Sequence, residues 1–233
     1  MNRIQAKNLT KKYNGVTALD HLDLTLKQGE IFCLLGQNGA GKTTTINLFL
    51  GFIEATEGEA FINDILIKSG DNSTKKFISY IPEVVMLYGN LSAAENLDYF
   101  SKLAGFKYSR QELEHHLFQA GLQPEANSKR VGTFSKGMRQ KVGIAIALAK
   151  NADVIFMDEP TSGLDPKATN EFTQIVRTLG MKGKTVMMAT HDIFNAVNVG
   201  ATIGIMRQGR LIHTLNAKDI DAVQLQQLYL ETI

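Results

Sequence analysis

An apolar run, Ile31-Phe32-Cys33-Leu34-Leu35, leads directly into Gly36-Gln37-Asn38-Gly39-Ala40-Gly41-Lys42-Thr43. Such a run is typical of a strand that is buried on both faces of a parallel sheet. Beyond the glycines, apolar side chains recur at helical spacing from Lys42 to Phe52, which predicts a helix. Glycines between a strand and a helix let the backbone approach an anion closely and direct its N–H groups at it. The segment is therefore predicted to bind phosphate.

The residue types of this loop match the pattern G-x-x-x-x-G-K-[ST] in the required context between strand and helix. Lys42 would supply positive charge to the β- and γ-phosphates of a nucleotide, and the Thr43 hydroxyl would ligate Mg²⁺. A glycine-rich turn that binds nothing is the alternative, and the flanking elements argue against it. The candidate nucleotide-binding residues are Gly36, Gln37, Asn38, Gly39, Ala40, Gly41, Lys42, Thr43 and Thr44.

Two adjacent carboxylates follow a second apolar run, Val154-Ile155-Phe156-Met157. Ligands of parallel sheets bind outside the carboxyl ends of the strands, so Asp158 is predicted to hold Mg²⁺ and Glu159 to orient or deprotonate a water. A solvated acidic loop is an equally ordinary reading of two acids alone, and the phosphate loop upstream favours the metal site. His191 follows a predicted strand over Thr185 to Ala189, so we expect its ring near the γ-phosphate.

The remaining pattern predicts an α/β fold with a helical insertion. Alternating Leu22, Leu24 and Leu26 indicate a half-buried strand, and residues 60–67 indicate a hairpin. Residues 91–150 are helical in texture, with capping-box spacing that begins at Ser92 and at Ser109. Further strands are predicted over 202–206 and 211–215, and helices over 168–179 and 223–231.

Composition excludes several classes of protein. The 233 residues include 25 Lys+Arg against 23 Asp+Glu, and a net charge of +2 is too close to neutral to argue for nucleic acid. The one cysteine, Cys33, cannot form an internal disulfide, so the composition does not indicate an oxidising compartment. The longest apolar runs, such as Ile144 to Ala149, are too short to span a bilayer. We expect a soluble chain whose membrane role, if it has one, comes through a partner.

Five segments resemble motifs of the ATP-binding cassette (ABC) ATPases of transporters, and they follow one another along the chain in the family's order. The resemblance covers essentially the whole chain. Asp158-Glu-Pro-Thr-Ser-Gly-Leu-Asp165 resembles the family's Walker B and D-loop, and Gly36 to Thr43 its Walker A. Phe134-Ser-Lys-Gly-Met138 resembles the signature loop, which is the most diagnostic match. His191 corresponds to the family's switch histidine, and Tyr13 to the aromatic residue that stacks on adenine.

The resemblance implies a P-loop NTPase core with an antiparallel β subdomain, over residues 1–85 and 151–233, and an inserted helical subdomain over 86–150. It also implies ATP and Mg²⁺ as cofactors, with Lys42, Glu159 and His191 as the catalytic residues. Two chains would form a head-to-tail dimer, in which the signature loop of one contacts the ATP of the other and Asp165 lies at the seam. The signature-loop residues are Ser135, Lys136, Gly137 and Met138.

Two motifs depart from the family pattern. The usual signature is Leu-Ser-Gly-Gly-Gln, so Lys136 stands where the family has glycine and Met138 where it has glutamine. In Ser79-Tyr-Ile-Pro-Glu83, Glu83 stands at the position of the Q-loop glutamine. A carboxylate still ligates Mg²⁺, so we expect Glu83 to couple the nucleotide to the membrane partner with an altered metal dependence.

The same motifs resemble stand-alone ATPase subunits of bacterial export systems for drugs, peptides, lipids or polysaccharides. Such a subunit is peripheral on the cytoplasmic face of the plasma membrane, has no transmembrane segment, and docks a polytopic permease, here expected near residues 83–91. A soluble ABC ATPase of an assembly system, such as an iron–sulfur scaffold, is the alternative. A chromosome-maintenance ATPase would need a long coiled coil, and the chain shows no sustained heptads.

Overall fold

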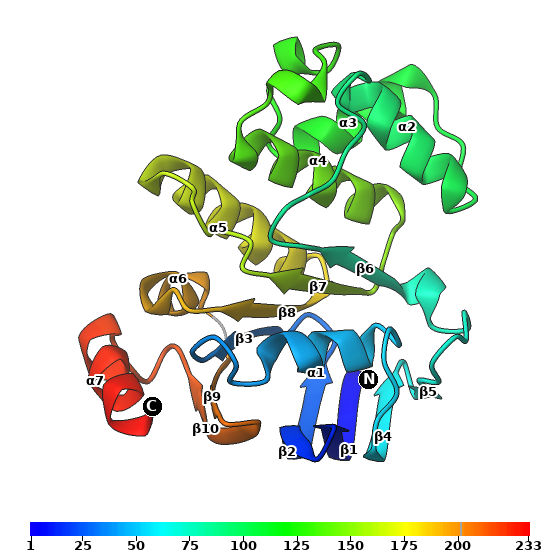
Figure 1. Ribbon diagram of the computed structural model, residues 1–233. Helices are drawn as coiled ribbons and strands as arrows, with labels where there is room; N and C mark the ends of the chain where they lie inside the picture. The colour runs from blue at the N-terminus through cyan, green and yellow to red at the C-terminus, as the bar shows by residue number, and fades with distance from the viewer. Residues whose placement is uncertain (201) are drawn as a thin grey trace.

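The computed structural model describes residues 1–200 and 202–233, and a six-stranded sheet lies at its centre (Figure 1). Its strand order is β10-β9-β3-β8-β7-β6, and every neighbouring pair is parallel except β9 with β10. The strands are β3 (Ile31–Leu35), β6 (Ile78–Ile81), β7 (Val154–Asp158), β8 (Thr185–Thr190), β9 (Thr202–Arg207) and β10 (Arg210–Asn216).

The central strands are apolar throughout because both faces of this sheet are covered. Cys33 and Leu35 of β3 join one hydrophobic cluster, which includes buried residues of the helices α2 to α7. Phe32 and Leu34 point the other way, into a cluster shared with α1 and the second sheet. All four side chains are buried. The predicted strand over Ile31 to Leu35 is confirmed, and its continuous apolar sequence has this two-sided burial as its cause.

The second sheet is antiparallel, with the order β2-β1-β4-β5. Its strands are β1 (Asn2–Tyr13), β2 (Val16–Lys27), β4 (Glu57–Ile62) and β5 (Ile65–Leu66), and α1 (Lys42–Phe49) packs between it and the central sheet. Leu22, Leu24 and Leu26 are buried on one side of β2, as their alternation predicts. The predicted hairpin is β4–β5, and Asn63 and Asp64 turn it at φ of 50° and 61°, values that these residue types tolerate.

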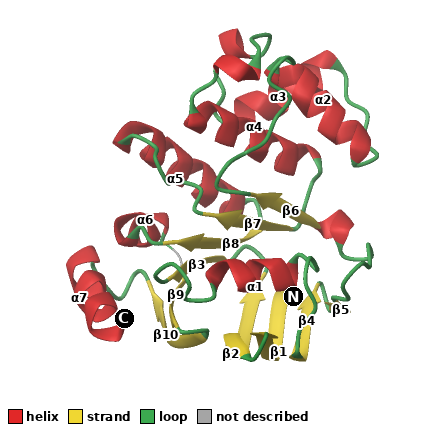
Figure 2. Cartoon of the chain, viewed as in Figure 1, coloured by secondary structure: helices red, strands yellow, loops and turns green. Residues whose placement is uncertain are grey.

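Three helices lie between β6 and β7 in the sequence. They pack together at the end of the molecule remote from the antiparallel sheet (Figure 2). They are α2 (Ala93–Leu103), α3 (Arg110–Gln119) and α4 (Lys136–Ala149). The capping boxes predicted at Ser92 and Ser109 are both present, each with a glutamate three residues on. The remaining helices are α5 (Pro166–Met181), α6 (Ile193–Val199) and α7 (Ala222–Thr232), with short 3₁₀ turns at Lys75–Phe77, Pro124–Ala126 and Val131–Thr133.

The structure adds elements that the sequence did not predict. Strand β1 is not predicted by periodicity because bulges interrupt its alternation of buried and exposed residues. Ile4 and Ala6 are buried, Asn8 then adopts φ 53°, and the next buried residue is Leu9. The predicted helix from Lys42 to Phe52 ends earlier, at Phe49, because Gly51 takes φ 64°. Over residues 1–200 and 202–233, no helix is both long and apolar enough to cross a membrane.

The stacked pair of Phe49 and Phe156 fixes the phosphate-loop helix against β7, with ring centroids 5.8 Å apart and both rings fully buried. We expect Phe156→Ala to lower the free energy of unfolding by about 3–5 kcal/mol, because it leaves a cavity between α1 and the sheet. Urea unfolding followed by circular dichroism measures this loss. Phe156→Leu, which keeps most of the volume, should cost clearly less; equal unfolding midpoints for the two variants would contradict the packing argument.

Candidate nucleotide-binding site

The carboxyl ends of four strands lie at one edge of the central sheet, and the candidate residues follow these ends. In the strand register, Leu35 of β3 pairs with Thr190 of β8, and Asp158 of β7 pairs with Ala189 of the same strand. Ile81 of β6 pairs with Met157. Because these strands are parallel and in register, the loops that begin at Gly36, Glu159 and His191 and the segment that contains Glu83 meet at this edge.

Packing requires glycine at two positions of the phosphate loop, Gly36 and Gly41, and backbone geometry also requires it at Gly41. A Cβ at Gly36 would lie 2.7 Å from the carbonyl oxygen of Met206, closer than side chains ever approach. Gly41, which begins α1, has φ 109°, and its Cβ would lie 2.7 Å from the carbonyl oxygen of Ala18. The loop therefore lies tightly between β9 and β2, with its shape fixed by its neighbours.

The Lys42 side chain curls back over its own loop. It is only 6% exposed, and its Nζ donates hydrogen bonds to the carbonyl oxygens of Gly36 (2.5 Å) and Gln37 (3.2 Å). The same Nζ lies 3.7 Å from Oε1 of Glu159. The loop thus holds a buried ammonium group where the resemblance places the charge that meets the β- and γ-phosphates.

Thr43 and Asp158 meet across the edge of the sheet, with the Thr43 hydroxyl donating to Oδ2 of Asp158 at 3.1 Å. Burial raises the pKa of Asp158, and the nearby Glu159 carboxylate adds to the rise, whereas the Thr43 hydrogen bond opposes it. Partly desolvated acidic oxygen beside a hydroxyl is the donor chemistry that Mg²⁺ prefers. These two residues fit the metal site that the sequence predicted, and a cation there would relieve the desolvated charge.

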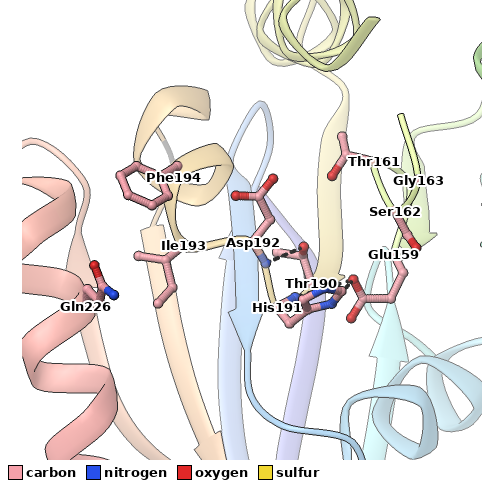
Figure 3. Close-up of a pocket in the computed structure, with 10 residues that line it drawn as sticks. All are labelled: Glu159, Thr161, Ser162, Gly163, Thr190, His191, Asp192, Ile193, Phe194 and Gln226. Carbon is pink, nitrogen blue, oxygen red and sulfur yellow. Dashed lines mark hydrogen bonds and ion pairs between the residues drawn. The ribbon is translucent and has the colours of Figure 1, made fainter. Parts of the chain in front are cut away.

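Glu159 is turned toward His191 by an unusual backbone. Its φ is 44°, in the left-handed region, and its backbone N–H donates to the carbonyl oxygen of Ala189 at 2.9 Å. Oε2 lies 2.8 Å from Nδ1 of His191 (Figure 3). Oε1 is buried and, among the described residues, has no hydrogen-bond partner, which leaves an acceptor free for a water.

Glu159 lines two cavities. One, of about 330 Å³, contains the phosphate-loop residues together with both carboxylates of the acidic pair. It is lined by Ala18, Gln37, Asn38, Gly39, Gly41, Lys42, Thr43, Thr44, Glu83, Asp158 and Glu159. The other, of about 390 Å³, lies on the His191 side and reaches Phe194 of α6 and Gln226 of α7 (Figure 3). The structure therefore brings together the predicted phosphate, metal and catalytic residues.

Other predicted site residues lie outside the cavity of about 330 Å³ that contains the phosphate-loop residues, called here the phosphate cavity. Tyr13 ends β1, where it pairs with Val16, and its ring lies 5.0 Å from Nζ of Lys11. Ser135 accepts a hydrogen bond from the Met138 N–H and so caps α4. Asp165 caps α5 in the same way, through the N–H of Ala168. None of these three side chains belongs to this chain's own phosphate cavity.

A buried polar network joins the loop after Glu159 to the helix after His191, and no sequence motif predicts it. The Asn195 amide donates to Oγ1 of Thr161 at 3.3 Å and accepts from Oγ1 of Thr173 at 2.7 Å. All three residues are at most 6% exposed. Because Asn195 lies on α6 and Thr173 on α5, the two loops that carry Glu159 and His191 are tied to a common support.

Removing the charge of Asp158 tests the electrostatics of the site. Because the folded-state pKa is raised above the ordinary value of 3.8, the stability that this group contributes is present below that value and lost as pH rises through the raised pKa. In metal-free buffer at neutral pH, Asp158→Asn should therefore melt at a higher temperature than the parent chain, and the difference should shrink as pH falls toward 4. A lower melting temperature for Asp158→Asn at neutral pH would contradict this account.

Known proteins resemble this chain in sequence and in fold. A family model described as ABC transporter matches residues 19–162. The "Probable multidrug ABC transporter ATP-binding protein YbhF" of Escherichia coli (strain K12) is 36% identical over 94% of this chain. The "Bacitracin transport ATP-binding protein BcrA" of Bacillus licheniformis is 36% identical over 91% of the chain, and the "Linearmycin resistance ATP-binding protein LnrL" of Bacillus subtilis (strain 168) is 34% identical over 90%.

Solved structures agree. The dimeric post-hydrolysis state of the ATP-binding cassette MJ0796, bound to ADP and Pi, matches with a TM-score of 0.80 at 29% identity and covers 92% of this chain and 98% of that one. MJ1267, at 22% identity, shares the fold with a TM-score of 0.85 over 99% of this chain and 96% of its own.

The relatives differ in how much of their own length they share. This chain spans only 38% of the length of YbhF, but 69% of BcrA and 68% of LnrL. The fold class predicted from the sequence is confirmed by the solved cassettes. Because the family model and relatives matched over nine-tenths of the chain agree, the chain belongs to the ABC transporter family and is one of its ATP-binding cassettes.

Proposed function

We propose that this chain binds and hydrolyses ATP as the nucleotide-binding subunit of an export-type ABC transporter. The observation that carries the proposal is the cavity of about 330 Å³ at the sheet edge, where Lys42, Thr43, Asp158 and Glu159 converge, with His191 held against Glu159. Phosphoryl transfer needs positioning and charge neutralisation more than covalent chemistry, and this set supplies a cation, metal-type oxygen donors and an acceptor for water.

Mg²⁺ is the metal that the donor set fits, with Thr43 and Asp158 as its ligands and Glu83 as a third oxygen donor on the same cavity. When bound, the ion neutralises negative charge on the β- and γ-phosphates. The chain's own residues do the rest. Lys42 would transfer its hydrogen bonds from the loop carbonyls to the phosphates, and the loop's N–H groups would hold the same oxygens.

Glu159 would accept a proton from the attacking water at Oε1, the buried oxygen that has no hydrogen-bond partner among the described residues and lies 3.7 Å from Nζ of Lys42. Its other oxygen is held by the His191 ring and, at 3.3 Å, by the His191 backbone N–H, so the carboxylate cannot rotate freely. His191 therefore orients Glu159, and with 63% of its side chain exposed it can also reach a γ-phosphate in the open edge. The geometry supports one base held by one histidine.

A second copy of the chain would complete the site. Ser135 to Met138 lie outside this chain's own phosphate cavity, and the N-terminus of α4 that they form is suited to an anion presented by another molecule. We propose a head-to-tail homodimer in which this signature loop contacts the partner's ATP and Asp165 lies at the seam. Tyr13, 43% exposed at the end of β1 where it pairs with Val16 of β2, would stack on adenine.

The membrane partner would dock on the helical insertion over residues 86–150. A mainly apolar groove of about 510 Å³ separates α2 from the core. Its lining includes the apolar side chains of Phe52, Tyr80, Phe100 and Leu103 and also Lys75, Lys76 and Lys150. Phe52 and Leu103 are more than half exposed, as are Val84 and Met86 in the segment predicted to dock a permease. The relatives' names, bacitracin transport and linearmycin resistance, favour an exporter over a scaffold ATPase. The chain would then lie on the cytoplasmic face of the plasma membrane.

Glu159→Gln should retain ATP binding, abolish turnover and trap an ATP-dependent dimer, because an amide keeps the shape of the carboxylate but cannot accept the proton. Lys42→Ala should instead weaken ATP binding at least tenfold, since a buried cation is lost from the phosphate loop. Phosphate release and equilibrium nucleotide binding separate the two outcomes. Full hydrolysis by Glu159→Gln would reassign the base, and unchanged affinity in Lys42→Ala would remove the phosphate-loop assignment.

The transport role predicts a polytopic membrane protein in complex with the trapped chain. Tagged Glu159→Gln, purified from gently solubilised membranes of the native cell with ATP and Mg²⁺, should carry that protein, identified by mass spectrometry. Leu103→Glu should reduce its recovery, because it places a charge in the groove. Phe118→Glu is the matched control, since Phe118 is equally exposed on α3 but outside the groove. Soluble partners alone would favour the assembly-scaffold alternative.

A further inference from the structure

The two positions at which this chain departs in charge from the family pattern contact each other. Glu83 follows β6, and Lys136 is the first residue of α4, far away in the sequence. Nζ of Lys136 lies 3.6 Å from Oε1 of Glu83. The Ser162 hydroxyl donates to the same oxygen at 3.0 Å. One carboxylate oxygen thus joins three segments: the one after β6, the signature loop and the loop after Glu159.

In the proposed dimer, this contact joins groups that belong to different nucleotide sites. Glu83 lines the phosphate cavity of its own chain, together with Thr43 and Asp158. Lys136 does not line that cavity and belongs to the loop proposed to meet the ATP of a second copy. Among the described residues, Glu83 is the only carboxylate within ion-pair distance of Lys136. The backbone of Glu83 is also held, since the Gln140 side-chain amide of α4 donates to the Glu83 carbonyl oxygen at 3.1 Å.

We propose that the Glu83–Lys136 ion pair is a resting contact between the two ATP sites of the dimer, which Mg·ATP breaks. The inference rests on the proposed ATP-driven dimer. In that dimer each member of the pair has a stronger partner of opposite charge: Glu83 has the divalent cation beside Thr43 and Asp158, and Lys136 has the phosphates on the second copy. ATP bound in one chain's own cavity therefore frees the lysine that acts on its partner's ATP.

The exposure of the pair sets the size of the effect. The Glu83 side chain is 51% exposed and that of Lys136 is 33% exposed, so water and salt weaken their attraction. Such a pair changes an equilibrium by about two- to fivefold, which is too little to prevent ATP from closing the dimer. It raises the ATP concentration at which closure occurs, and it does so only while both charges are present.

A double-mutant cycle isolates this coupling from the direct effect of either charge on ATP. In the Glu159→Gln background, four versions are compared: unaltered, Glu83→Gln, Lys136→Gly, and both together. Light scattering measures the Mg·ATP concentration that gives half dimer, and thermal unfolding without nucleotide checks that each version folds. The cycle removes any effect that Glu83→Gln has independently of Lys136, because that effect is the same in both backgrounds.

The effect of Glu83→Gln is expressed as the half-dimer Mg·ATP concentration before the substitution divided by that after it. We expect this ratio to be about two- to fivefold larger when Lys136 is present than in Lys136→Gly. High KCl should make the two ratios equal. The matched control is the ion pair of Lys141 with Glu171, at 2.6 Å between α4 and α5 and outside the phosphate cavity, whose own cycle should show no coupling to dimerisation.

Two failures are distinguishable. Equal shifts in both backgrounds, or a larger shift in Lys136→Gly, would overturn the exchange, since the pair would then persist or strengthen in the dimer. Absence of any ATP-dependent dimer in all four versions, with ATP still bound, would overturn the proposed dimer on which the inference rests.

Discussion

Covering the central sheet on both faces is the constraint from which the rest of this molecule follows. Once helices lie on one face and the antiparallel sheet with α1 on the other, the central strands β3, β7 and β8 meet the outside only at their ends. Backbone N–H groups and polar side chains accumulate at the carboxyl ends because the strands are parallel and in register. The phosphate loop, the acidic pair and His191 are therefore neighbours although they are far apart in the sequence.

This constraint also explains why much of the fold was predictable. Strands buried on two faces are written as unbroken apolar runs, so β3 and β7 stood out, and the capping boxes at Ser92 and Ser109 marked the starts of two helices. Strand β1 was not predicted because its bulge at Asn8 breaks the period of two, and β6 has only four residues. Short or irregular elements take their form from tertiary contacts, which leave little trace in local sequence.

The site divides in the same way. Lys42, Thr43, Asp158 and Glu159 were predictable because their spacing beside a strand is dictated by phosphate and metal chemistry. The left-handed backbone of Glu159 and the support from Asn195 were not, because they arise from how strand ends and helices meet in space. Glu83 and Lys136 were each recognised as departures from a pattern, but only the fold shows that they face each other.

The curled Lys42 side chain has a consequence for how a ligand enters the loop. With its ammonium group bonded to two loop carbonyls, the loop is braced by its own lysine and holds its shape. When a phosphate binds, Lys42 exchanges carbonyl acceptors for phosphate oxygens. A disordered segment does not have to become ordered. Backbone ordering, about 1–2 kcal/mol for each residue, has already occurred during folding and does not weaken the affinity for nucleotide.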